Sequence, residues 1–191
     1  KAKTEFTHGA ELSRKLRSTR PALTGAALRQ RITSTLRLPS REGVCEFRIM
    51  TGASARGYPK KNHAEYLLET EPDIQVFVYR LSEGRLLSRP PRGPKRAVLY
   101  VAHRSADEEL RTDPWLKEIC EAEPKAAIYA CDVRGVGESQ PGISTSDNPQ
   151  KSRVDNMHAG FGVLFDYPTA GQRTFDLLRV LDWMAGYDHE E

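Results

Sequence analysis

Two continuous apolar runs, separated by one short helical pattern, constrain the fold of this chain more than any other feature. They are residues 97–102 (AVLYVA) and 126–131 (AAIYAC). Between them, Asp113 and Pro114 suit the N-cap and the first position of a helix. Continuous apolar runs are typical of strands that helices bury on both faces. The alternation of strand and helix therefore predicts an α/β sheet with a parallel centre.

Three further strand candidates precede this unit. They cover residues 44–50, 63–70 and 74–81, and they alternate as strands do. Residues 71–73 separate the last two, with a tight turn at Pro72 and Asp73, and so short a connection favours an antiparallel hairpin. We therefore expect antiparallel hairpins at the edge of the sheet.

The first 39 residues form a basic segment with a helical pattern. Residues 1–50 hold 11 Lys and Arg against 4 Asp and Glu, whereas the whole chain has a net charge of +3. The helical pattern covers residues 10–37 and breaks at Pro21. A basic arm can bind nucleic acid or an anionic surface, but a solvated amphipathic helix explains the same pattern. We expect a helical arm over residues 1–39, a second domain over residues 40–191, and no nucleic-acid partner.

Composition excludes several other classes. The 191 residues are 38% apolar and 29% charged, which fits one domain with a small appendage. No apolar run approaches the roughly 20 residues that span a bilayer, so no membrane partner is expected. Cys45, Cys120 and Cys131 lack the spacing of a disulfide framework, and the last two fit buried positions. No motif predicts a metal or a cofactor.

The last third of the chain predicts one irregular stretch and one helix. Residues 140–168 are rich in Gly, Ser, Asn and Asp, and we expect a long loop there. Residues 169–185 carry a broad apolar helical face. Asp176, Arg179 and Asp182 have i,i+3 spacing on that helix, so we expect a polar ladder along one face.

The turn after the second apolar run, DVRGVGES at residues 132–139, is the main candidate for a site. Gly135 and Gly137 permit a sharp turn where a parallel strand ends, and α/β sheets bind ligands at such ends. No G-x-G-x-x-G motif is present, so a dinucleotide site is not expected. Ser139 is not in a G-x-S-x-G context, which argues against a nucleophile. Asp132, Arg134 and Ser139 are instead expected to tie the loop together.

Four segments of the chain together resemble the acetyl xylan esterase-like branch of the α/β-hydrolase superfamily. This branch is similar to carbohydrate esterases and prolyl-oligopeptidase-type hydrolases. The segments are residues 65–74, the run from Ala97, the turn at 132–139 and the helical stretch 171–183, and the resemblance covers about residues 40–185. It implies the N-terminal part of an α/β-hydrolase sheet, with antiparallel edge hairpins and a parallel centre, preceded by the helical arm.

The resemblance also implies where a site would lie. The loop after the first apolar run lends a backbone N–H to the oxyanion hole, which makes His103, Arg104 and Ser105 the oxyanion-loop candidates. Arg104 stands where a glycine is frequent in the family, and a loop whose His103 only binds nearby backbone is the alternative. The cleft-loop candidates are Asp132, Arg134, Gly135, Gly137, Ser139 and His158. For His158 a surface or packing role is the alternative.

Two functions follow as expectations. The first is part of a serine esterase that acts on acyl esters such as acetyl esters, through a Ser-His-Asp triad. In this fold the triad follows the last helix of this chain, so no catalytic residue is assigned within the 191 residues. The second is a non-catalytic α/β-hydrolase-like scaffold or binding protein. The expected partners are an acyl-ester or carbohydrate-ester substrate if the domain is completed, and a second polypeptide or self-association that covers the sheet edge.

Overall fold

The computed structural model describes residues 4–50, 56–84, 96–140 and 151–187, with only the backbone described for residues 151–157 and 187. The chain divides into two compact units, residues 1–35 and residues 36–191. Across the described segments, no helix is both long enough and apolar enough to cross a bilayer. No group of three or more His, Cys, Asp or Glu side chains in these segments is arranged to hold a metal ion.

The first unit is helical. It contains α1 (Glu5–Thr19) and most of α2 (Gly25–Leu36), which confirms the predicted helices and their break at Pro21. Thr4 caps α1, because its side chain accepts a hydrogen bond from the backbone N–H of Thr7 at 3.2 Å. Neither helix contains a buried residue, as expected of helices whose polar residues lie on several sides.

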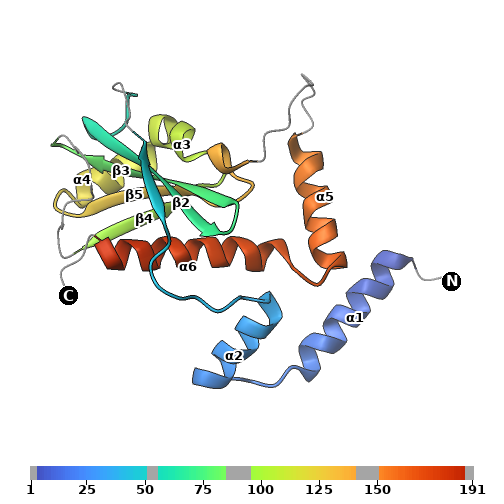
Figure 1. Cartoon of the computed structure of the whole chain (residues 1–191). Helices are drawn as coiled ribbons and strands as arrows, with labels where there is room; N and C mark the ends of the chain where they lie inside the picture. The colour runs from blue at the N-terminus through green and yellow to red at the C-terminus, as the bar shows by residue number, and fades with distance from the viewer. Residues whose placement is uncertain (1–3, 51–55, 85–95, 141–150, 188–191) are drawn as a thin grey trace. The chain divides into compact units, whose positions relative to one another are not determined.

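The second unit is built on one five-stranded sheet (Figure 1). Its strand order is β1-β2-β3-β5-β4. The strands are β1 (Phe47–Met50), β2 (Asn62–Glu71), β3 (Ile74–Ser82), β4 (Ala97–Val101) and β5 (Ala127–Asp132). The first four in this order pair antiparallel, and only β4 and β5 pair parallel. The predicted hairpins are therefore confirmed, with Asp73 in the left-handed region at φ 64° in the tight turn.

The predicted parallel centre is found as one parallel pair among the described strands. The parallel pair lies at one end of the sheet, because the antiparallel β3 borders β5 and β4 is the last strand. All six residues of β5 are buried, as predicted for a strand covered on both faces. The residues of β4 are only half-buried, and Val101 is 40% exposed. Two similar apolar runs thus differ in burial, because β5 has two neighbouring strands and β4 has one among the described residues.

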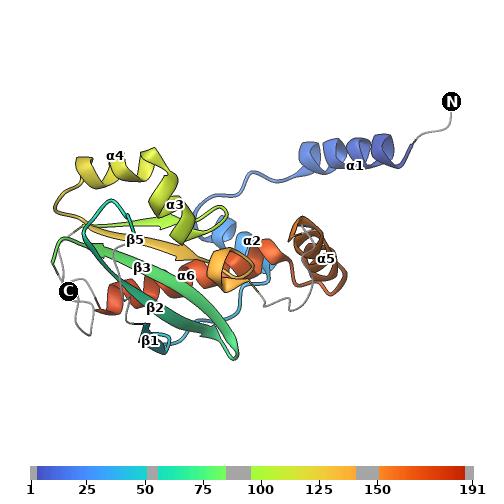
Figure 2. The same cartoon turned by 90° about the horizontal axis from the view of Figure 1, so that it is seen from above.

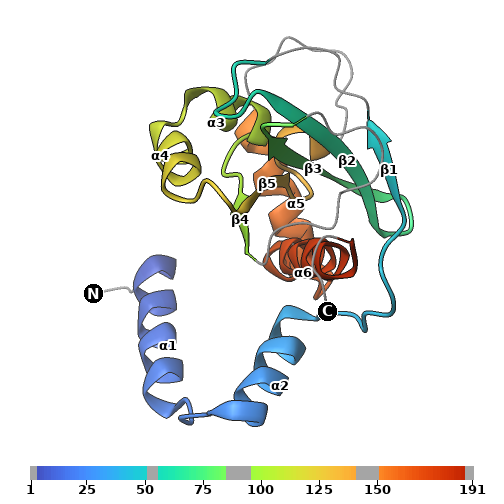
Figure 3. The ribbon, with the colours of Figure 1, turned by 90° about the vertical axis from the view of Figure 1, so that its left-hand side faces the viewer.

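Helices cover both faces of the sheet. Figure 3 shows α6 (Thr169–Tyr187) on one face and α3 (Ala106–Thr112) with α4 (Pro114–Ala122) on the other. On the α6 face, the buried Trp183 packs against Tyr66 and Tyr129, with ring centroids at 5.0 and 6.1 Å. On the opposite face, Leu110 and Leu116 are buried. The two layers together enclose β5.

Several local predictions need correction. The stretch 140–168 is not irregular throughout, because α5 (Lys151–Leu164) forms in it. Its glycines concealed the helix, and in its described second half Val163 and Leu164 are exposed. The first strand begins at Phe47 rather than at residue 44, and α6 continues through Gly186. Asp113 does cap α4, by accepting from the Trp115 N–H at 2.9 Å, and the Trp115 ring is exposed.

Candidate functional site

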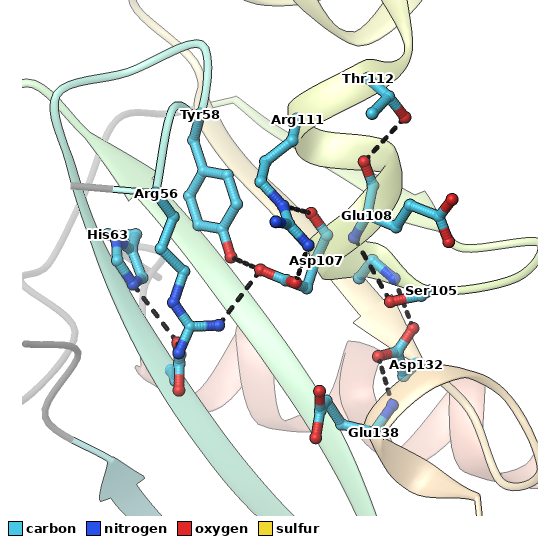
Figure 4. A network of polar contacts seen from close by, with 12 residues as sticks. Arg56, Tyr58, His63, Ser105, Asp107, Glu108, Arg111, Thr112, Asp132 and Glu138 are labelled. Carbon is cyan, nitrogen blue, oxygen red and sulfur yellow. Dashed lines mark hydrogen bonds and ion pairs between the residues drawn. The ribbon is translucent and has the colours of Figure 1, made fainter. Parts of the chain in front are cut away.

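The carboxyl ends of β4 and β5 lie at the same edge of the sheet, and Asp132 joins the two loops that follow them. Asp132 is fully buried at the end of β5. Its Oδ1 accepts a hydrogen bond from the Ala106 N–H at 2.7 Å, and its Oδ2 accepts one from the Glu138 N–H at 3.1 Å (Figure 4). The turn is also tied directly to the β4 loop, since the Gly137 N–H donates to the Arg104 carbonyl at 2.9 Å. One carboxyl group therefore fixes both loops.

Burial raises the pKa of Asp132 to about 6, although the N–H groups of Ala106 and Glu138 lower it. A carboxyl group whose pKa is higher in the folded state stabilises the fold when it is protonated. The free energy of unfolding should therefore fall by about 2–3 kcal/mol between pH 4 and pH 7 through this group, at about 1.4 kcal/mol per pKa unit. Urea titrations of the protein and of Asp132→Asn at several pH values measure this. A stability difference between the two that stays constant with pH would contradict it.

The predicted oxyanion loop is bound by the side chain of Glu109, which lies in α3, the helix that follows the loop. The backbone N–H groups of His103, Arg104 and Ser105 all donate to the Glu109 carboxylate, at 3.1, 2.6 and 3.3 Å. The Tyr100 hydroxyl donates to the same carboxylate at 2.6 Å. Burial would raise the pKa of Glu109, but the hydrogen bonds from Tyr100 and from the three backbone groups lower it. Sequence spacing gave no signal for this contact.

Glu109→Gln should lower the free energy of unfolding by about 2–3 kcal/mol, because charge-assisted hydrogen bonds to several donors are lost together. Glu108→Gln is the matched control. Glu108 is exposed on the same turn of α3, so its replacement should change stability by less than about 0.5 kcal/mol. Urea unfolding of the two variants measures the difference. Equal effects would show that the Glu109 carboxylate does not hold the loop.

Arg134 lies at the centre of a second network that joins three distant segments. Its Nε and backbone N–H donate to Asp176 Oδ2 at 2.7 and 3.0 Å, and its Nη2 also contacts Glu71. Asp176 is fully buried in α6 and accepts a further hydrogen bond from the Thr70 hydroxyl at 2.6 Å. Tyr167 donates to Glu71 at 3.0 Å. Burial would lower the pKa of Arg134, but Asp176 and Glu71 raise it.

This network corrects the predicted polar ladder of α6. Asp176 does not lie on an exposed face, and its described partners belong to β2 and to the turn after β5. Arg179 is also buried and donates to the carbonyl oxygens of Glu42 and Gly43 at 3.1 and 2.8 Å. Of the three predicted ladder residues, Arg179 and Asp182 approach each other along the helix, at 3.9 Å.

A cavity of about 590 Å³ opens beside the turn after β5, and we call it the α5 cavity. Figures 1 and 2 show α5 beside the start of α6. The lining residues come from the start of β3, the turn after β5, α5 and the start of α6: Asp73, Ile74, Gln75, Phe77, Arg134, Gly135, Glu138, Ser139, Gln140, His158, Phe161, Gly162, Phe165, Tyr167, Thr169, Gln172 and Arg173. Its volume is in the range of small-molecule sites.

Four of the six cleft-loop candidates line this cavity, namely Arg134, Gly135, Ser139 and His158. Asp132 and Gly137 do not line it. The Ser139 hydroxyl is engaged on two sides, since it donates to the Asp132 carbonyl at 2.7 Å and accepts from the Phe77 N–H at 3.1 Å. These contacts hold the turn against β3.

A third polar cluster, around Asp107, was not expected from the sequence. Tyr58 donates to Asp107 at 2.5 Å, and Arg56 and Arg111 also pair with it (Figure 4). Arg56 makes a second ion pair with Glu65 at 3.2 Å. Burial would raise the pKa of Asp107, but the hydrogen bonds from Tyr58 and Arg56 lower it. The cluster attaches the segment before β2 to α3.

Comparison with known proteins supports the fold of the chain at the level of structure. No protein-family model matches the chain, and no curated protein matches it. A solved structure from Bacteroides fragilis NCTC 9343, provisionally assigned as an acetyl xylan esterase, matches all of this chain with a TM-score of 0.63 and 12% sequence identity. The chain spans about half of that protein, 53% of its length. The second unit and its sheet therefore have an esterase-like fold, of which this chain corresponds to a part.

Proposed function

We propose that the chain forms the N-terminal part of the catalytic domain of a serine esterase that acts on acyl esters. The nucleophile and its partners would lie on residues outside these 191. The observation that carries the proposal is the edge of β4 that no described strand covers, which lies next to the loop of His103–Ser105 in an esterase-like sheet.

The hydrogen bonds of β4 support a further parallel strand at this edge. The Ala102 N–H donates to the Cys131 carbonyl, and the Arg96 carbonyl accepts from the Ala127 N–H, each at 3.0 Å. In a parallel strand, the backbone groups of alternate residues point to opposite sides. Because Arg96 and Ala102 face β5, Leu99 and Val101 present their N–H and C=O groups to the open edge. A strand added there would end beside the β4 loop.

In this proposal, the residues of this chain position the ester and stabilise charge. A serine on the added strand attacks the ester carbonyl, a histidine takes and returns the proton, and backbone N–H groups bind the oxyanion. The loop after β4 carries three such N–H groups, and Glu109 binds all three. The Glu109 carboxylate must therefore move before this loop can donate to an oxyanion.

The alternative is a non-catalytic hydrolase-like scaffold. Two observations favour it: the three loop N–H groups are already bound by Glu109, and Arg104 replaces the glycine frequent in hydrolases. A scaffold would need neither a serine nor a vacant oxyanion site. It would keep the α5 cavity for binding alone.

Labelling with a fluorophosphonate, together with hydrolysis of p-nitrophenyl acetate, separates the two functions. The 191-residue chain alone should neither be labelled nor hydrolyse the ester above the buffer rate. The natural protein, isolated under native conditions, should be labelled at one serine outside residues 1–191. A folded natural protein without labelling would favour the scaffold. Labelling at Ser139 would contradict the assignment of that hydroxyl to the turn.

A further inference from the structure

We infer that the α5 cavity is a binding site for a neutral small molecule with an aromatic ring. The inference concerns binding and does not depend on ester hydrolysis. It rests on the aromatic side chains, the balance of charge and the hydrogen-bonding groups of the cavity.

Four aromatic side chains line the cavity: Phe77 from β3, Phe161 from α5, and Phe165 and Tyr167 from the connection between α5 and α6. The rings of Phe161 and Phe165 stack, with centroids 6.3 Å apart and an interplanar angle of 26°. These two residues are 48% and 73% exposed. When a ligand covers apolar surface that faces water, the free energy of binding becomes more favourable by roughly 25 cal/mol per Å² of apolar area. A flat ring adds stacking to that gain.

The charges around the cavity favour an uncharged ligand. Arg134 and Arg173 line it, and so do Asp73 and Glu138, which leaves no net formal charge among these four. Arg134 is in addition bound by two carboxylates, those of Asp176 and Glu71. An anionic ligand would be repelled by the two acidic side chains, and a cationic ligand would be repelled by the two arginines. Neither kind of ligand would find an excess of opposite charge.

Polar groups in the wall fit a ligand that also carries a hydroxyl or carbonyl group. Gln75, Gln140 and Gln172 line the cavity. Gln172 donates its Nε2 to the Tyr167 carbonyl at 2.7 Å, and this leaves its Oε1 as an acceptor. A few placed polar groups in a mostly apolar wall are typical of small-molecule sites. The site therefore suits a phenol, an aromatic alcohol or an aryl ester.

The test uses 2-naphthol, which is neutral at pH 7, with two matched ligands. The 2-naphthalenesulfonate ion keeps the rings and carries a charged sulfonate in place of the hydroxyl, and decahydro-2-naphthol keeps the hydroxyl and removes the aromaticity. Calorimetric titration of the natural protein should give one site for 2-naphthol, with each of the other ligands bound about fivefold or more weakly. Equally tight binding of the sulfonate or of the saturated alcohol would overturn the inference.

Variants locate the site on α5. Phe161→Ala should weaken 2-naphthol binding by about fivefold or more, and Phe165→Ala should act in the same direction. Val163→Ala is the matched control, because Val163 is 76% exposed on the same helix and does not line the cavity. If one of the two phenylalanine variants does not fold, the other can still be used for the test. Equal affinities of the Phe161, Phe165 and Val163 variants would place binding elsewhere. If the natural protein did not hydrolyse esters, the proposed function would fail, but the affinity for 2-naphthol would still test this inference.

Discussion

Asp176→Ala is expected to lower the free energy of unfolding by about 3–5 kcal/mol. The substitution leaves the Arg134 guanidinium in a half-buried position with Glu71 as its remaining carboxylate partner, and it removes the acceptor of the Thr70 hydroxyl. The loss of one member from a buried ion pair costs more than the pair itself contributes, because a desolvated charge remains. Urea unfolding followed by circular dichroism measures the effect.

Asp182→Ala is the matched control for this result. Asp182 lies on the same helix, pairs with Arg41 at 2.8 Å and remains about one-third exposed. Exposed pairs contribute little, so its loss should cost less than about 1 kcal/mol. If the two variants were equally destabilised, the Arg134 network would not connect β2, the turn after β5 and α6 in the way described.

Gly137→Ala is expected to destabilise the protein by about 3 kcal/mol or more, for two independent reasons. Gly137 has φ 49°, a conformation that costs an L-residue roughly 1–2 kcal/mol. An added Cβ would also lie 2.2 Å from Asp132 Oδ2, so it would displace the carboxyl group that joins the two loops. The expected result is a lower unfolding midpoint together with weaker protection of the Ala106 and Glu138 amides from hydrogen exchange.

Gly160→Ala serves as the contrasting substitution. Gly160 lies in α5, and a Cβ added there meets no atom within 4 Å. Alanine favours a helix over glycine by about 1 kcal/mol, so this variant should be as stable as the protein or slightly more stable. A Gly137→Ala variant with unchanged stability and unchanged amide protection would contradict the close packing of the turn against Asp132.

The parts of the fold that sequence patterns predict are local. The hairpin of β2 and β3 follows from alternation and from a two-residue turn, and the start of α4 follows from Asp113 and Pro114. The position of β4 could not be predicted in this way. A run of apolar residues shows that a strand can be buried, but not which strands lie beside it.

The site was predicted in part for the same reason. The DVRGVGES turn marks the end of β5, and the family resemblance adds Arg134, Gly135 and Ser139 as cleft-loop candidates; all three line the cavity. The partners of Arg134 lie 42 and 63 residues away in sequence, in α6 and β2, and spacing along one helix suggested a different role for Asp176. Long-range charge pairing of this kind depends on tertiary structure. Of the cavity residues in α5, only His158 was among the candidates, because the helix itself was not predicted.

Hydrogen exchange at β4 tests the central claim, that this sheet continues beyond β4 in the natural protein. Val98 and Tyr100 face β5, and Leu99 and Val101 face the open edge, so one strand supplies both the test and the control. In the 191-residue chain alone, Leu99 and Val101 should exchange about 100-fold faster than Val98 and Tyr100. In the natural protein all four amides should be similarly protected. Rapid exchange of Leu99 and Val101 in the natural protein as well would show that no strand pairs with this edge of β4. That result would contradict the esterase proposal, which requires such a strand.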